Sequence, residues 1–203
     1  MSNDCLGYAG LDQPAKLIDR SLYDQISKTD YRKSLFNGPE GDKTASADTP
    51  GAARPYASRK FGFMEQWLQD YIYMRASEMV LIEAESYARL GDGAKAASVL
   101  GELMAKRDIA WKAASVTVDD VLLQRRIELW GEGHGYYDLR RNGKGIDRNY
   151  EGSNHTPANR IKVPAHDNLW WFQLPLKEIT ENDMISEEEQ NPWTKKQDND
   201  KED

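Results

Sequence analysis

Residues 70–93 read "DYIYMRASEMVLIEAESYARLGDG" and carry the clearest helical pattern in the chain. Apolar side chains recur there at spacings of three and four, at Tyr73, Ala76, Val80, Ala84 and Tyr87. Charged residues line another face, and Glu85 precedes Arg89 by four positions, the favourable order for an ion pair on a helix. This periodicity predicts an amphipathic α-helix that buries one side against the rest of the protein.

The residues that follow predict a second helix packed back against the first. Gly91, Asp92 and Gly93 should end the first helix, because glycine enters the left-handed cap conformation at little cost. The stretch "AKAASVLGELMAKR" at 94–107 is rich in alanine, and small side chains beside a tight turn let two helices approach closely. Such a hairpin is the unit of tetratricopeptide-type repeats, although no second copy follows at a period of about 34 residues.

A third helix should begin at Thr117. The stretch "TVDD" at 117–120 pairs a Thr cap with Asp120 three residues later, an acidic variant of the capping box. Its aspartates also favour the positive end of the helix dipole. We expect this helix to end near Gly131 or Gly133, so the fold class is mainly α, with tetratricopeptide-like helical hairpins, long loops and short extended segments.

The flanking sequence predicts three segments. Residues 1–60 are dense in Gly, Pro, Ser and Asp, so we expect a loop-rich lead-in, poorly ordered in part, in which only Lys16–Ile26 could form a short helix. Residues 61–193 form the helical domain, and "NLWWFQLPLKEI" at 168–179 reads as a short buried strand or extended segment stopped by Pro175. Residues 194–203 should be a disordered acidic tail.

Composition restricts the function classes. The formal charge is −7 and no basic face with interleaved aromatics is present, which argues against nucleic acid as a partner. A single cysteine, Cys5, offers neither an internal disulfide nor a thiolate cluster. No apolar run approaches the roughly 20 residues of a membrane helix, and the first ten residues lack the features of an export signal. We therefore expect no anchor or signal in this sequence.

The stretch "RRIELWGEGHGYYDLRR" at 125–141 gathers the charged candidates for a site. Glu128, Glu132 and Asp138 could serve a carbohydrate hydrolase, which needs two carboxyl groups about 5 to 10 Å apart. Neighbouring arginines would instead hold the carboxylates ionised, whereas a general acid must keep its proton. We therefore favour a structural charge knot over catalysis and assign no catalytic residue; the knot would contain Arg125, Arg126, Glu128, Glu132, Asp138 and Arg141.

Neither a metal nor a cofactor is expected. His134, His155 and His166 are scattered and lack the helical spacing of a metal site.

Aromatic side chains offer a second kind of site. An aromatic face can stack on the apolar face of a sugar ring while polar neighbours bind its hydroxyls. Tyr56 in a Pro-Tyr loop, Trp67 and Trp170 are the candidates, and at least one of Trp170 and Trp171 should face the core. Trp130 is expected in the core.

Several short motifs occur in a fixed order along the chain. They are Arg75, Glu78, Leu81, Ala84-Glu85, Arg125-Arg126, Glu128-Leu129, Glu132-Gly133-His134, Asp138-Leu139-x-Arg141, Leu174-Pro175 with Glu178-Ile179, and Gln190-Asn191-Pro192. In this order the sequence resembles the C-terminal part of the SusD/RagB family over about residues 60 to 193, and the "DYRK" segment at 30–33 resembles the family's lead-in. It departs from the family's pattern at Gly101, Gln124, Gly131 and Gly135.

The resemblance implies a function as well as a fold. Family members are surface lipoproteins of Bacteroidetes that bind glycans or other nutrients without catalysis and cap a TonB-dependent, SusC-like transporter at the outer membrane. Family members are more than twice as long, and their ligand contacts come largely from the portion before the matching region. We therefore expect this chain alone to bind soluble glycans weakly or not at all. The alternatives are the hydrolase and a helical-repeat adaptor, which would require an accidental family match.

Overall fold

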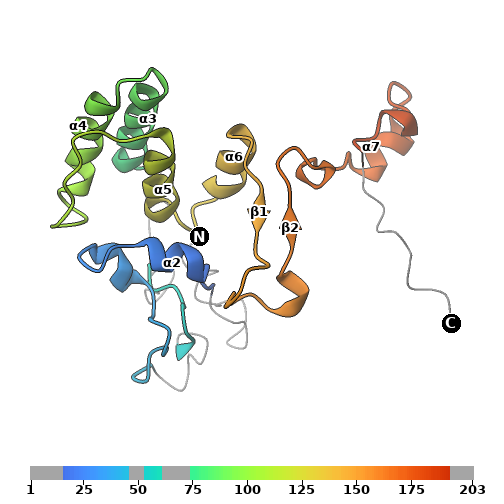
Figure 1. Ribbon diagram of the computed structural model, residues 1–203. Helices are drawn as coiled ribbons and strands as arrows, with labels where there is room; N and C mark the ends of the chain where they lie inside the picture. Colours follow the sequence, from blue (N-terminus) through green and yellow to red (C-terminus); the bar gives the residue numbers. More distant parts are fainter. Residues whose placement is uncertain (1–15, 46–52, 61–73, 193–203) are drawn as a thin grey trace, which may run out of the picture. The chain divides into compact units, whose positions relative to one another are not determined.

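The computed structural model describes residues 16–45, 53–60 and 74–192, and these residues are mainly helical (Figure 1). Their α-helices are α2 (Arg20–Gln25), α3 (Ala76–Arg89), α4 (Gly93–Met104), α5 (Val118–Glu128), α6 (His134–Arg141) and α7 (Leu176–Glu181). Short 3-10 helices span Tyr31–Leu35, Pro157–Asn159, Asn168–Trp170 and Glu187–Glu189. The chain divides into two compact units. Unit 1 contains the described residues through Gly135 together with Gly152–His155, and unit 2 contains Tyr136–Glu151 and residues 156–192.

The predicted helical hairpin is confirmed in α3 and α4 of unit 1. Gly91 adopts a φ of 84° in the turn, and the Asp92 side chain caps α4 by accepting the Lys95 N–H at 2.9 Å. Ala96 and Ala97 are buried where α4 lies against α3, so their small side chains permit the close approach. The mainly α, tetratricopeptide-like fold class is therefore correct.

The buried side of α3 differs in detail from the predicted stripe. Leu81 and Ala84 are fully buried, while Ala76, which the spacing placed on the buried face, is exposed. Both α4 and α5 pack against α3, so the buried face is broader than a single stripe and is rotated toward Leu81. The expected pair between Glu85 and Arg89 is present at 2.7 Å.

Helix α5 begins with the predicted capping box. The Thr117 hydroxyl accepts the Asp120 N–H at 3.2 Å, and the Asp120 carboxylate accepts the Thr117 N–H at 2.8 Å. The helix ends at Glu128, three residues before Gly131, and Gly131 and Gly133 follow with φ values of 79° and 90°. These positive φ values favour glycine at both positions.

Replacing Thr117 with alanine should lower the free energy of unfolding by about 1 kcal/mol, because the first turn of α5 loses a cap that satisfies its backbone N–H groups. Denaturant unfolding followed by circular dichroism measures the loss. Thr117→Ser keeps the hydroxyl and should retain most of the stability. Equal losses in the two variants would show that the cap contributes little.

The lead-in segment packs more tightly than its composition suggested. Ile18, Leu22 and Ile26 occur at intervals of four, and with Phe36 they form a second buried cluster against Ile127 of α5. Isolated bridges join Leu17 to Ala57 and Phe36 to Ser58. Residues 16–45 and 53–60 are therefore packed as well as loop-rich, because their few apolar side chains are spaced to face one core, and the short helix α2 lies within the predicted Lys16–Ile26. Trp130 borders this cluster with an edge-on contact to Phe36.

Unit 2 contains little regular structure. Strands β1 (Ile146–Asp147) and β2 (Lys162–Val163) pair antiparallel, with Ile146 opposite Val163. The sequence predicted either a short buried strand or an extended segment at 168–179. The structure rules out the buried strand. This stretch forms a 3-10 turn, an extended segment at 171–175 and then α7, and Phe172 is 68% exposed. The predicted tail at 194–203 lies outside the described residues.

Candidate functional site

Glu128, at the end of α5, is the centre of a buried charge cluster in unit 1. Its side chain is 3% exposed and accepts two hydrogen bonds from Arg107, at 2.9 and 3.0 Å. Arg32 and Arg75 each reach the same carboxylate at 3.2 Å. Three arginines from three separate segments therefore converge on one carboxylate, and the two-pronged bond from Arg107 fixes its orientation.

Glu132 joins the same cluster from the turn after α5. Its carboxylate accepts hydrogen bonds from Arg75, at 2.8 and 3.0 Å, and from Lys60, at 2.5 Å. Lys60 also donates to the backbone carbonyls of Glu128 and Trp130. Burial lowers the pKa of Lys60, and the bond to Glu132 opposes that shift. We call Arg32, Lys60, Arg75, Arg107, Glu128 and Glu132 the charge cluster.

The electrostatics of Glu128 decide what it can do chemically. Burial by itself would raise the pKa of this carboxyl, but the hydrogen bond from Arg107 and the charges of Arg107, Arg32 and Arg75 outweigh burial and lower the pKa to about 2. A group with this pKa is ionised throughout the physiological range and cannot deliver a proton as a general acid. The arrangement instead ties α5 to three other segments of unit 1.

The residues proposed for the charge knot from sequence only partly coincide with this cluster. Glu128 and Glu132 belong to it, but Arg125 bonds to Glu78 of α3 at 3.2 Å and Arg126 is exposed. Asp138 pairs with Arg141 of its own helix at 2.9 Å, within unit 2. Arg126 lies two positions from Glu128 on α5, so the two side chains project in different directions, whereas Arg125 is held by Glu78.

Sequence reasoning missed four cations that do hold the carboxylates, namely Arg32, Lys60, Arg75 and Arg107. Arg32 and Arg75 stand in motifs that carried the family resemblance, and no feature of the sequence linked them to Glu128. Arg32 also pairs with Asp30 at 2.6 Å, and both side chains are 3% exposed. The only feature of the sequence that could have pointed to Arg32 was its charge inside the "DYRK" motif.

The described residues contain no group of three or more His, Cys, Asp or Glu placed to hold a metal ion. His134 lies 3.3 Å from Arg125 and 3.6 Å from Glu78, among charged partners of unit 1. None of the helices in the described ranges is long and apolar enough to span a bilayer.

Two of the three aromatic candidates named from sequence, Tyr56 and Trp170, are not exposed platforms. Tyr56 is 8% exposed and packs edge-on against Tyr23, with ring centres 5.4 Å apart. Trp170 is 5% exposed, and its indole N–H donates to the Pro164 carbonyl at 2.7 Å. Both rings therefore contribute to packing. Trp67 lies outside the described residues. The expectation that at least one of Trp170 and Trp171 faces the core is confirmed, with Trp170 as that residue.

Exposed aromatic rings gather elsewhere in unit 2. Tyr137, Trp171 and Phe172 are 64%, 46% and 68% exposed. The Tyr136 ring lies 5.2 Å from both the Tyr137 and the Phe172 ring, and the Arg140 guanidinium lies 4.6 Å from the Trp171 ring centre. We call Tyr137, Trp171 and Phe172 the aromatic surface. Exposed rings of this kind can stack on the apolar faces of sugar rings.

Side-chain amides hold the segment that carries two of these rings. Gln190 accepts the Leu174 N–H at 2.8 Å and donates to the Leu174 carbonyl at 3.1 Å, as a neighbouring strand would. Asn191 donates to the Phe172 carbonyl at 2.7 Å. Tyr136 of α6 donates its hydroxyl to the Trp170 carbonyl. The "QNP" motif thus fixes the extended segment, and Trp171 and Phe172 protrude from it.

Comparison with known proteins places this geometry in a family. The sequence profile of the SusD family matches residues 64–193. No curated protein matches the chain significantly.

Solved structures show the same fold. The chain is 25% identical to a SusD-like carbohydrate binding protein from Bacteroides vulgatus, with a TM-score of 0.59 over 80% of this chain and 39% of that one. It is 24% identical to a SusD superfamily protein from Bacteroides vulgatus, with a TM-score of 0.63 over 87% of this chain and 39% of the other.

A third structure is surface glycan-binding protein A from Bacteroides uniformis. It is 20% identical, with a TM-score of 0.56 over 88% of this chain and 40% of that one. The chain therefore spans about two fifths of the length of these three structures. Because the matching residues make up more than half of the chain and the helical fold agrees, the chain belongs to the SusD family.

Proposed function

We propose that this chain is part of a cell-surface protein that binds glycans or related nutrients without hydrolysing them. The observation that carries the proposal is its membership of the SusD family, supported by a 25% identical solved relative described as a SusD-like carbohydrate binding protein. The helical-repeat adaptor is not retained, because it required the family match to be accidental.

The aromatic surface is the place on this chain that best suits a sugar chain. Its three rings are exposed, and the segment that carries Trp171 and Phe172 is fixed by backbone and amide hydrogen bonds. A preformed surface loses little conformational entropy when a ligand binds. The contact area is small compared with an enclosed site, so we expect dissociation constants in the millimolar range for short oligosaccharides.

The hydrolase alternative receives no support from the carboxylates it would use. Glu128 is buried and held ionised by three arginines, and Glu132 is bonded to Arg75 and Lys60. Asp138 lies in unit 2 and pairs with Arg141. We therefore propose capture of the ligand without chemistry.

Delivery to a TonB-dependent, SusC-like transporter at the outer membrane completes the proposal. It rests on the family alone. Co-purification of the tagged protein with such a transporter from detergent-solubilised membranes would support it, and a protein that stays in the soluble fraction without a transporter would contradict it.

Replacing Trp171 with alanine should weaken oligosaccharide binding about fivefold, because one stacking ring on the aromatic surface is lost. Titrations followed by NMR of the ring and indole N–H resonances measure the dissociation constants. Met184→Ala, which removes another exposed apolar side chain of unit 2, is the matched control and should bind normally. Release of reducing ends by the unmodified chain, or no resonance moved by any oligosaccharide, would refute the proposal.

A further inference from the structure

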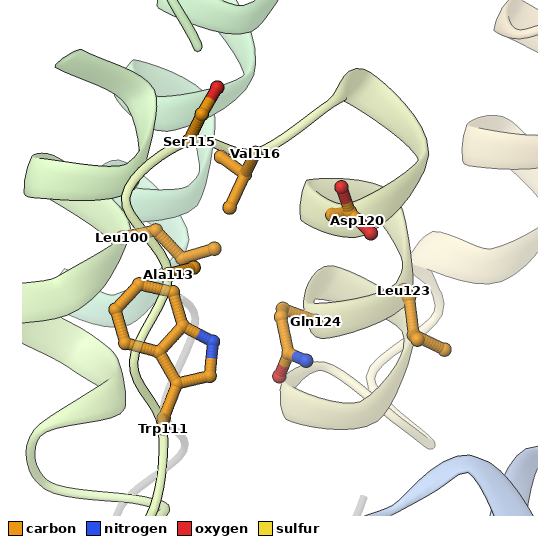
Figure 2. Close-up of a pocket in the computed structure, with 8 residues that line it drawn as sticks. All are labelled: Leu100, Trp111, Ala113, Ser115, Val116, Asp120, Leu123 and Gln124. Carbon is orange, nitrogen blue, oxygen red and sulfur yellow. The ribbon is translucent and has the colours of Figure 1, made fainter. Parts of the chain in front are cut away.

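A small pocket lies in unit 1, and one of its lining residues, Gln124, is hydrogen-bonded to Arg32 of the charge cluster. The pocket is bounded by α4, the segment at 111–116 and the first turns of α5 (Figure 2). Its volume is about 180 Å³, and Leu100, Val116 and Leu123 provide apolar wall. Sites for drug-sized ligands have volumes of about 300–1,000 Å³, so this pocket can hold one ring and no longer chain.

The indole of Trp111 forms one wall of the pocket, and a glycine permits its position. A Cβ atom at Gly101 would lie 3.3 Å from Trp111 Cζ3, so the absence of a side chain lets the ring lie against α4. The backbone is fixed as well, because the Trp111 N–H donates to the Asp108 carbonyl at 3.1 Å and the Asp108 side chain is itself bonded to Thr29 at 2.5 Å. The ring is half-buried and preorganised.

Some polar groups around this ring have hydrogen-bonding capacity that the protein itself does not use. Figure 2 shows the N–H edge of Trp111 facing Gln124, and among the described residues its Nε1 has no hydrogen-bond acceptor. Gln124 accepts from Arg32 through its carbonyl oxygen at 2.5 Å, and Figure 2 shows this oxygen nearer the Trp111 ring than the amide nitrogen is. Asp120 uses Oδ2 in the capping box, and its Oδ1 remains as an acceptor. The pocket lining thus contains one N–H donor, oxygen acceptors and an aromatic wall.

This combination selects a class of ligand. A purely apolar ligand would leave the Trp111 N–H group without a partner at a cost in free energy. An anion would meet the Asp120 carboxylate, and a cation would meet the Trp111 N–H donor. A sugar ring avoids the three conflicts that exclude apolar, anionic and cationic ligands. Its hydroxyls both donate and accept, and its C–H face can lie on an indole.

From this geometry we infer that the Trp111 pocket is a binding subsite for a single sugar ring, distinct from the aromatic surface. The inference rests on the proposed glycan-binding function and adds a second point of contact within the helical part of unit 1.

The test uses the whole chain labelled with ¹⁵N, titrated with monosaccharides such as glucose, galactose, mannose and N-acetylglucosamine. The Trp111 indole N–H resonance should shift and saturate with at least one of them. Ala113→Leu fills the pocket and should raise the dissociation constant at least tenfold, while Ala94→Leu makes the same change at an exposed position of α4 and should leave it unaltered. Thermal unfolding of both variants checks that they remain folded.

The outcomes separate the two proposals. If oligosaccharides move the Trp171 resonance and no sugar moves that of Trp111, the subsite is refuted and the proposed function stands. If Ala113→Leu binds as well as Ala94→Leu does, the Trp111 shift arises outside the pocket and the inference is overturned. If no sugar moves either resonance, both proposals fail.

Discussion

Replacing Glu128 with glutamine is expected to lower the free energy of unfolding by about 3–5 kcal/mol. The substitution keeps the shape of the side chain but removes the charge toward which Arg32, Arg75 and Arg107 point. Arg32 is 3% exposed, so it would keep a buried charge with one fewer carboxylate. Breaking a buried pair in this way costs far more than losing a surface pair, which contributes about 0–1 kcal/mol. Denaturant unfolding at neutral pH measures the loss.

Glu83→Gln is the matched control for this change. Glu83 is exposed on α3, and its loss of charge should alter stability by less than about 0.5 kcal/mol. If Glu128→Gln proves too unstable to purify, Arg107→Lys removes the two-pronged bond while keeping the charge and should show a smaller loss of the same sign. A Glu128→Gln variant as stable as the Glu83 control would show that the charge cluster does not hold unit 1 together.

Acid should remove the same contribution from the unmodified protein. The pKa of Glu128 is about 2 in the folded state, against an ordinary value of 4.5. The unfolded chain therefore binds the proton more readily, so the stabilisation is complete above about pH 4.5 and is lost as pH falls toward 2. The shift corresponds to roughly 3 kcal/mol, because each pKa unit is worth 1.36 kcal/mol.

Other carboxylates also titrate in the acid range. The quantity to measure is therefore the difference in the free energy of unfolding between the unmodified chain and Glu128→Gln. The free energy of unfolding of the unmodified chain, minus that of Glu128→Gln, should be constant between pH 5 and 7 and shrink steadily below pH 4.5. Comparison of Glu83→Gln with the unmodified chain over the same range supplies the baseline. A difference that stays constant down to pH 2.5 would contradict the lowered pKa of Glu128.

Local patterns in the sequence determined much of the helical part. The periodicity of residues 76–89, the glycines at 91 and 93 and the box formed by Thr117 and Asp120 each act within a few residues, and α3, α4 and α5 follow from them. The buried face of α3 was predicted less accurately. The spacing placed Ala76 on it, whereas the structure buries Leu81. The family could also be recognised from the sequence, because its motifs are short and occur in a fixed order.

The aromatic residues show where local patterns stop being informative. Trp170 and Trp171 are adjacent and chemically identical, yet Trp170 is buried and Trp171 is 46% exposed. Trp170 is the buried residue because its carbonyl accepts from the Tyr136 hydroxyl and its indole N–H donates to the Pro164 carbonyl. The Trp111 pocket was equally hidden, since it depends on the contact between Trp111 and Gly101 of α4.

The sequence by itself therefore determined that α3, α4 and α5 are helical, where α4 and α5 begin and to which family the chain belongs. Tertiary structure alone decided the partners of Glu128, which come from positions 96, 53 and 21 residues away in the sequence. The physical reason is range: backbone propensities, caps and i to i+4 pairs act along the chain. Charge pairing and burial act through space, between segments that only the folded core brings together.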